Sequence, residues 1–305
     1  CWKRSGHGYM NMRNAIIQSC DVYFYTAAKT MGIDNLEYIY KQIGFGNKTN
    51  VDITDELAGL VPSRQWKRSV RKEGWYPGET IITGIGQGYI LITPMQLAQA
   101  ASVIAMRGVS TTPHFLLQKK TPDFEFVRYE PKSADTIIAG YPEALDYVIS
   151  AMHGVTADDS GTARSIKFPE TYTIAGKTGT SLVAALGVSG TKANLKDHKL
   201  FMAFAPVEAP EIAISVIIEN AGESTPTKHA IARKMMDAYL LDNADIKAKL
   251  PNPNQKAESG SDIPNFLKPN QTDQSDQGAE VLDLDQNKPN TEQHYDEPNY
   301  PNESD

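Results

Sequence analysis

The spacing of apolar residues changes along the chain. Over most of the first 110 residues apolar side chains recur at helical intervals, whereas residues 200–206 and 212–218 are short apolar runs typical of buried strands. Helices are expected at 12–18, 22–31, 35–43, 94–107, 147–153 and 226–241, with strands and turns at 109–141 and 173–180. Helices, then consecutive strands forming an antiparallel meander, then a closing helix predict an α+β fold in which helices pack on an antiparallel sheet.

Glycine, proline and capping residues mark the ends of these helices. Gly32 is placed to stop the second helix, and Thr93, Pro94 and Gln96 match a capping box with proline at the first helical position. Residues 47–80 are rich in Pro and Gly and are expected to be mostly loop. The basic residues in this stretch predict a solvated face; they are Arg64, Lys67, Arg68, Arg71 and Lys72.

Gly84, Gly86 and Gly88 precede the capped helix. A glycine-rich turn before a helix can bind a dinucleotide, but that function requires G-x-G-x-x-G spacing after a strand, and this segment has neither. We therefore expect close backbone packing at these glycines.

Charge and proline content separate the C-terminal segment from the rest. The whole chain has a formal net charge of −7, and residues 251–305 hold 12 Asp and Glu against 3 Lys and Arg, which leaves +2 for residues 1–250. Seven of the 18 prolines also lie in this segment. Such a composition cannot bury enough apolar surface to offset its ordering entropy. We therefore predict one domain at 1–245 and a disordered, acidic, Pro-, Asn- and Gln-rich tail at 246–305.

The first residues of the chain do not read as the start of a protein. Residue 1 is Cys, and the chain opens directly on the aromatic and basic segment Trp2-Lys3-Arg4. There is no apolar run of about 18 residues and no signal peptide. We expect the C-terminal part of a longer protein, whose other segments would carry any membrane anchor and further catalytic residues.

The motif Lys177-Thr178-Gly179-Thr180 places reactive groups on an expected strand. Neighbours on a strand face opposite sides, so Thr178 and Thr180 share one face and Lys177 takes the other. Gly176 and Gly179 leave room for another backbone or a ligand. An ammonium, two hydroxyls and open backbone groups at a strand edge suit a small, acidic, peptide-like ligand.

A second polar group, Ser19-Cys20-Asp21, lies between two expected apolar helices. Small polar residues in this position either cap a helix or form a site raised on a helical hairpin. The segment taken alone favours capping.

Together these segments resemble class B penicillin-binding proteins. In that family and in class A β-lactamases, S-x-N and K-T-G motifs accompany an upstream S-x-x-K, and here residues 19–21 are similar to the second motif and residues 177–179 to the third. The other similar blocks are 1–8, 84–98 and 197–206, which most resemble the elongation-specific D,D-transpeptidases of Gram-negative cell walls. The similarity spans about residues 1–240. It implies a penicillin-binding-protein transpeptidase or serine β-lactamase-like fold, truncated on its N-terminal side.

The resemblance also implies an activity. A serine acyl-enzyme would crosslink peptidoglycan stem peptides and would bind β-lactams. Its partners would be a glycosyltransferase and other elongation-complex membrane proteins, with no role for nucleic acid, and its catalytic domain would face the periplasm from the inner membrane. The implied catalytic residues are Ser19, Asp21 and Lys177, and the implied substrate-binding residues are Thr178, Gly179 and Thr180.

The chain departs from the family pattern in two places. No S-x-x-K lies upstream of Ser19, so the nucleophile is expected before Cys1 and residues 1–305 alone are expected to be inactive. Asp21 stands where the wider family has Asn; a carboxylate accepts hydrogen bonds but cannot donate one unless it is protonated.

Two other functions use the same motifs. A serine β-lactamase would need a base that activates water for deacylation, and the sequence shows no such residue. A sensor or scaffold of the same fold would bind β-lactams or wall fragments without catalysis, and a complete gene without S-x-x-K would favour it.

The two cysteines suggest a metal site. Cys1, His7 and Cys20 offer two thiolates and an imidazole, which are three of the four ligands of a structural zinc; an upstream Asp or Cys would be the fourth. Such a site would pin the glycine-containing loop to the motif at 19–21. The alternatives are a Cys1–Cys20 disulfide and a buried Cys20 acting as a small apolar residue.

Overall fold

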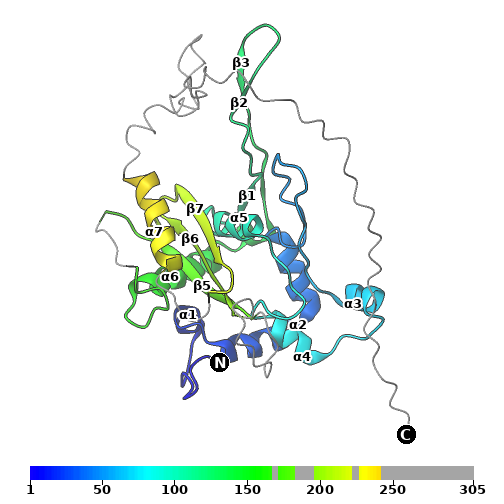
Figure 1. Ribbon diagram of the computed structural model, residues 1–305. Helices are drawn as coiled ribbons and strands as arrows, with labels where there is room; N and C mark the ends of the chain where they lie inside the picture. The colour runs from blue at the N-terminus through cyan, green and yellow to red at the C-terminus, as the bar shows by residue number, and fades with distance from the viewer. Residues whose placement is uncertain (167–170, 183–195, 222–226, 242–305) are drawn as a thin grey trace, which may run out of the picture. The chain divides into compact units, whose positions relative to one another are not determined.

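The computed structural model describes residues 1–166, 171–182, 196–221 and 227–241 (Figure 1). Its helices are α1 (Met12–Ile17), α2 (Asp21–Gln42), α3 (Arg64–Val70), α4 (Pro77–Thr83), α5 (Pro94–Ala105), the 3-10 helix η1 (Ile137–Gly140), α6 (Pro142–Ala157) and α7 (Thr227–Leu240). Its strands are β1 (Val109–Thr111), β2 (Gln118–Lys120), β3 (Phe126–Arg128), β4 (Ser133–Asp135), β5 (Ala175–Ser181), β6 (His198–Ala205) and β7 (Ile212–Ile218). The pairs β1–β4 and β2–β3 and the sheet β5–β6–β7 are all antiparallel, so the predicted α+β fold is confirmed.

The three-stranded sheet is the predicted meander. β6 lies between β5 and β7, so β5 is an edge strand in the described part of the chain. Seven residue pairs fix β5 against β6, with Lys177 opposite Met202 and Thr180 opposite Lys199. A slip of one residue would move every side chain to the other face. The pairing therefore determines which face each residue of the Lys177–Thr180 motif occupies.

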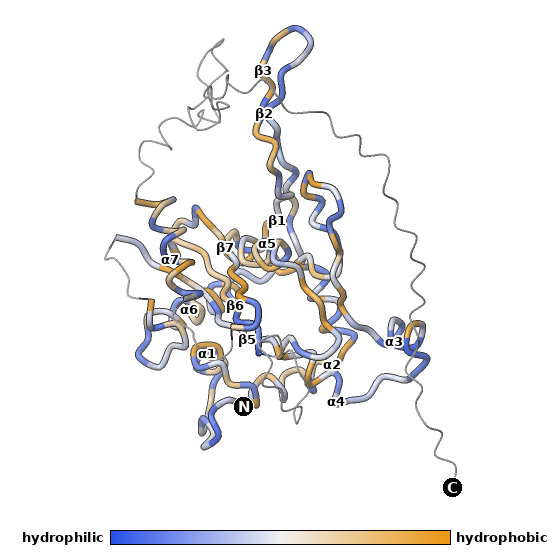
Figure 2. The backbone as a smooth tube through the Cα atoms, viewed as in Figure 1, coloured by the Kyte–Doolittle hydropathy of each residue, from blue (hydrophilic) through white to orange (hydrophobic). Residues whose placement is uncertain are grey.

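The largest apolar core lies between this sheet and three helices. α6 packs against β5, whereas α5 and α7 pack against β6 and β7. Phe201 and Phe204 of β6, Val155 of α6 and Met236 of α7 are fully buried in it, and Figure 2 shows the apolar positions along β6 and β7. Full burial of such a side chain contributes about 1.5–3 kcal/mol to stability. The core thus holds β5 from one side and leaves its edge open.

The glycine predictions hold in modified form. Gly32 interrupts the helical backbone, as predicted: at φ 76° and ψ 161° it forms a kink within α2, where the helices predicted at 22–31 and 35–43 meet. The predicted close packing is confirmed at Gly84, where a Cβ would overlap the Cβ of Ala28 as α4 meets α2, but it is wrong at Gly86, where an added Cβ would have nothing within 4 Å.

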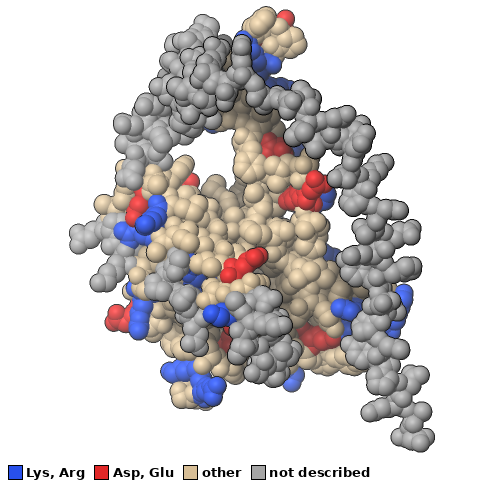
Figure 3. All heavy atoms as spheres, viewed as in Figure 1, with Lys and Arg blue, Asp and Glu red and all other residues tan. Residues whose placement is uncertain are grey.

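Residues 47–80 are mostly loop, as predicted, but α3 lies within this stretch and α4 begins in it. The predicted solvated basic face is also wrong at Lys67, whose side chain is 1% exposed and lies 2.5 Å from Glu79 and 3.3 Å from Glu73. A buried ammonium needs such partners to offset the loss of its hydration. On the face seen in Figure 3, basic and acidic side chains of the described residues are interspersed.

The last described helix, α7, ends at Leu240, within the domain predicted at 1–245. The predicted tail, 246–305, lies outside the described residues. A search of the described helices finds none with the length and apolar character needed to cross a membrane.

Candidate active site

Ser19 lies at the corner between α1 and α2, in a backbone conformation that few residues except glycine adopt. Its φ is 53°, and a residue in this region costs about 1–3 kcal/mol, which is a common feature of functional sites. The Trp2 indole N–H holds the corner by donating to the carbonyls of Gln18 and Ser19 at 3.0 and 3.2 Å. The position of the serine is therefore set by contacts outside the motif.

Lys177 connects this corner to the sheet. Its Nζ donates to Ser19 Oγ at 2.9 Å and to the Thr178 carbonyl at 2.8 Å. Ser19 and Lys177 are 158 positions apart in sequence. The structure thus places the predicted second and third motifs at one site.

The ammonium of Lys177 lies in an unfavourable environment. Its pKa is lowered to about 8, chiefly by burial; the Asp21 carboxylate opposes this shift, and nearby Lys228 adds to it. Lys228, on α7, also has a pKa lowered to about 8, first by burial and then by Lys199. Lys177 is therefore mostly charged at neutral pH but close to the pH at which it can release its proton.

Backbone groups of the motif face the open edge of β5. The Thr178 carbonyl accepts from Lys177, and the Thr180 carbonyl accepts from the Gln87 side chain at 2.7 Å. Since the N–H and C=O of one strand residue point to the same side, the Thr180 N–H also faces this edge. A ligand lying along the edge would find a backbone donor there.

The motif hydroxyls have neighbours from other elements. Thr178 Oγ1 lies 2.8 Å from Thr162 Oγ1, in the segment that follows α6. Thr180 is exposed, and Lys199 Nζ of the paired strand lies 3.4 Å from its Oγ1. Gly179 allows β5 to lie close to β6, since a Cβ there would lie only 3.2 Å from Leu200 Cβ.

Asp21 is the first residue of α2, where a carboxylate favours the helix N-terminus. Its charge raises the pKa of Lys177. Among the described residues Asp21 forms no hydrogen bond with Ser19 or Lys177, so its influence on the site is electrostatic.

The comparison with known proteins decides the family. Residues 1–237 match the family model described as the penicillin binding protein transpeptidase domain. The chain belongs to this family. The peptidoglycan D,D-transpeptidase MrdA of Acinetobacter baumannii is 42% identical over 246 residues, which are 79% of this chain and 36% of that protein. The predicted similarity to penicillin-binding D,D-transpeptidases is confirmed.

Solved transpeptidase structures have the same fold. Pseudomonas aeruginosa PBP2 in complex with WCK 5153 aligns with a TM-score of 0.69 at 39% identity, over 80% of this chain and 52% of that one. The complex between PBP2 and MreC from Helicobacter pylori aligns with a TM-score of 0.67 at 32% identity, over 79% of this chain and 42% of that one. The chain spans about two fifths of the length of the curated relatives.

A downstream S-x-x-K pattern is not the family's first motif. It comprises residues 69–72, after Ser19 instead of before it. The Ser69 hydroxyl is exposed near the end of α3 and donates to the Trp66 carbonyl at 2.9 Å. The Ser69 hydroxyl is therefore hydrogen-bonded within α3.

Four other residues at the transpeptidase motifs have no local pattern that assigns them a role, although Gln87 and Lys199 lie within the similar blocks 84–98 and 197–206. Each lies at least 15 positions from the motif that it touches or influences, and only their pairing in space identifies them. They are Gln87, Thr162, Lys199 and Lys228.

The predicted metal ligands also lie together. Ligand atoms of Cys1, His7 and Cys20 are all within 4.8 Å of one another, and both cysteines are free thiols without a disulfide. His7 Nε2 is buried and has no hydrogen-bond partner in the described structure, an orphaned position that a bound metal would satisfy. Two thiolates and an imidazole are typical ligands of structural zinc.

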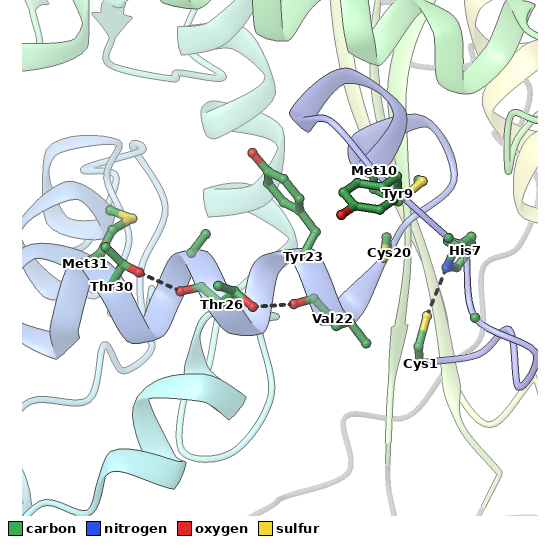
Figure 4. A pocket seen from close by; sticks show the side chains of 13 residues that line it. Cys1, His7, Tyr9, Met10, Cys20, Val22, Tyr23, Thr26, Thr30 and Met31 are labelled. Atoms are coloured by element: carbon green, nitrogen blue, oxygen red, sulfur yellow. Dashed lines mark hydrogen bonds between the residues drawn. The ribbon is translucent and has the colours of Figure 1, made fainter.

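These three residues line one end of a pocket of about 950 Å³ (Figure 4). Cys1 and His7 face each other across 3.4 Å between Sγ and Nδ1. The pocket continues along α2, past Tyr23 to Met31. Cys20, which follows Ser19 in sequence and caps the start of α2, joins the cluster to this corner.

Proposed function

We propose that the protein is a peptidoglycan D,D-transpeptidase that crosslinks stem peptides through a serine acyl-enzyme during cell-wall elongation. The contact between Lys177 Nζ and Ser19 Oγ at 2.9 Å carries this proposal, because it brings the second and third motifs together as the two sides of one acyl-transfer site. The names of the relatives support the same reaction. Carboxypeptidase activity would follow when water replaces the acceptor amine.

The nucleophile of this reaction would come from a part of the relatives' length that the chain does not span. In the first step the serine Oγ attacks the carbonyl of the penultimate D-Ala and forms an ester, and the terminal D-Ala leaves as an amine. Ser19 would pass the required proton to that amine. In the second step the amine of another stem peptide attacks the ester, forms the crosslink and releases the serine.

The residues of β5 would bind the donor peptide. Lys177 supplies positive charge for its terminal carboxylate, and the hydroxyls of Thr178 and Thr180 contact that carboxylate. The Thr180 N–H, which shares the open edge with its carbonyl, would be one of two oxyanion donors. One such donor is worth about 3–4 kcal/mol in the activation barrier.

Penicillin labelling of the protein encoded by the complete gene tests this function. We expect an S-x-x-K upstream of Ser19 and a stable acyl-enzyme. Rapid turnover of the penicillin would favour a β-lactamase, and β-lactam binding without acylation would favour a sensor. A complete gene without S-x-x-K would contradict the proposed mechanism.

We also propose that Cys1, His7 and Cys20 hold one structural zinc. The metal would supply a fixed link between the N-terminal loop and α2, and so would stabilise the corner at Ser19. We expect about one zinc per chain in the complete protein, with loss of the metal and a lower melting temperature in His7→Ala. His114→Ala, at a partly exposed imidazole outside the cluster, is the matched control. Wild-type protein without metal would contradict the proposal.

The partners and the location are proposals of the same kind. The H. pylori relative forms a complex with MreC, and we propose that this protein also works with elongation-complex membrane proteins and a glycosyltransferase. Its transpeptidase domain would lie in the periplasm, attached to the inner membrane. Co-purification with those partners from membranes tests this arrangement, and recovery of the complete protein alone would count against it.

A further inference from the structure

Gln87 occupies the open edge of β5 in the manner of a bound peptide. Its Nε2 donates to the Thr180 carbonyl at 2.7 Å, and its Oε1 accepts from the Leu182 N–H at 3.4 Å. One carboxamide thus uses an acceptor and a donor on alternate residues of one strand edge. A single residue of a neighbouring parallel strand would make the same pair of hydrogen bonds.

The turn at residues 86–88 fixes the backbone position of Gln87, but the side chain of Gln87 can still change rotamer. Gly86 and Gly88, on either side, have φ values of 75° and 82°. Residues that carry a Cβ rarely adopt such positive φ values. The turn therefore determines the direction of the Gln87 side chain. Because that side chain has three rotatable bonds and is only partly buried, it can withdraw from the edge without unfolding the turn.

The donor peptide of the proposed function needs the same backbone groups. To place its carbonyl at the Thr180 N–H, an extended peptide must lie along β5, as in strand addition. Its own N–H would then be directed at the Thr180 carbonyl, where Gln87 Nε2 now lies. Gln87 and the ligand would compete for one acceptor.

We propose that Gln87 is a specificity-determining residue that caps the β5 edge in the free protein and is displaced by ligands that bring their own amide N–H. This inference rests on the proposed function, since it needs an extended peptide at Thr180. A ligand with an amide N–H replaces one hydrogen bond by another. A ligand without one would leave the Thr180 carbonyl unpaired if it displaced Gln87, so such a ligand binds with the cap in place and gains nothing from its removal.

The test compares two β-lactams on the protein encoded by the complete gene. Benzylpenicillin carries a secondary amide, and penicillanic acid carries none. In Gln87→Ala we expect the second-order rate constant of acylation by benzylpenicillin to rise about threefold to tenfold, the value of one net hydrogen bond. The rate constant for penicillanic acid should change less than about twofold, because that ligand does not displace the cap.

Two further variants separate competition from folding. Gln87→Met keeps the length of the side chain but cannot donate, and we expect the same selective gain as in Gln87→Ala. Gln65→Ala, at an exposed position of α3, is the matched control and should change neither rate constant. Equal losses for both β-lactams in Gln87→Ala would show that Gln87 only supports the turn, and no change with benzylpenicillin would show that it does not compete; either result overturns the inference.

Failure of the proposed function would appear separately, as a wild-type protein that benzylpenicillin does not acylate. In that case the dissociation constant of diacetyl-L-Lys-D-Ala-D-Ala still tests the inference. We expect a dissociation constant at least about threefold lower in Gln87→Ala than in the wild type. An unchanged dissociation constant would overturn the inference.

Discussion

The two sides of the site are built differently. β5 is a regular strand whose register is fixed by seven pairs with β6, and its reactive groups alternate as strand geometry requires. The side that carries Ser19 is a corner between two helices, with a φ of 53° at the serine and support from Trp2. The sheet side therefore depends on its backbone pairing, and the helical side depends on contacts made by distant side chains.

This difference predicts different responses to substitution. A change on β5 should either remove a reactive group or disturb strand packing, and both effects follow from the register. A change at the Ser19 corner should alter either the backbone strain at Ser19 or the side-chain contacts, such as those of Trp2, that hold the corner. The following variants test that contrast, from the largest expected effect to the smallest.

Removal of the Lys177 ammonium should have the largest effect. We expect Lys177→Ala to slow penicillin acylation of the complete protein by about a thousandfold, because it removes the positive charge facing both Ser19 and the ligand carboxylate. Stopped-flow acylation kinetics measure this change. Lys29→Ala, at an exposed position of α2, is the control. Near-normal labelling of Lys177→Ala would contradict the role given to the sheet side.

A methyl group at Gly176 should disturb the strand without touching the chemistry. The added Cβ would lie 2.8 Å from Phe201 Cζ and 2.9 Å from the Met202 carbonyl, so we expect Gly176→Ala to lower the free energy of unfolding by about 1–3 kcal/mol. Urea unfolding measures it. Gly78→Ala, with nothing within 4 Å of the added Cβ, should be neutral or stabilising. Equal stability of the two variants would mean that β5 is not held against β6 as described.

The low pKa of Lys177 predicts a pH dependence. Since its pKa is lowered to about 8, the ammonium charge is present below pH 8 and is lost above it. Affinity for a carboxylate ligand should therefore fall as pH rises from 7 to 9, approaching tenfold per pH unit once the group is neutral. Titration of ligand binding measures this fall.

Two variants sharpen the pH experiment. Lys177→Arg keeps its charge throughout this range and should remove the fall in affinity. Lys228→Met removes a repelling charge and should move the midpoint to higher pH, while Asp21→Asn should move it to lower pH. A midpoint that does not respond to Lys228 or Asp21 would assign the titration to another group.

The strain at Ser19 predicts the smallest effect. Ser19→Ala and Ser19→Gly both lose the hydroxyl, but glycine tolerates a φ of 53° and should give a free energy of unfolding about 1 kcal/mol higher than alanine. At Ser69, inside α3, the order should reverse, since glycine is the poorer helix former by about 1 kcal/mol. The same order at both positions would show that the Ser19 corner carries no strain.

Much of the fold follows from local sequence. The capping box is present, with Thr93 Oγ1 accepting from the Gln96 N–H at 3.1 Å, and the apolar runs at 200–206 and 212–218 do form adjacent strands. The failures have a common cause. α3 and α4 carry little apolar periodicity. α4 is stabilised by contacts such as the ion pair of its partly buried Glu79 with the buried Lys67, which no local pattern encodes.

By itself the sequence determined the residue types of the site and the faces of β5, because alternation in a strand and the spacing within a motif are local properties. Only the tertiary structure decided that Lys177 meets Ser19 across 158 positions and that Gln87 lies on the edge of β5. These contacts arise where separate elements pack on a common core. Their geometry depends on the packing of side chains that are far apart in the chain. No short stretch of sequence contains that information.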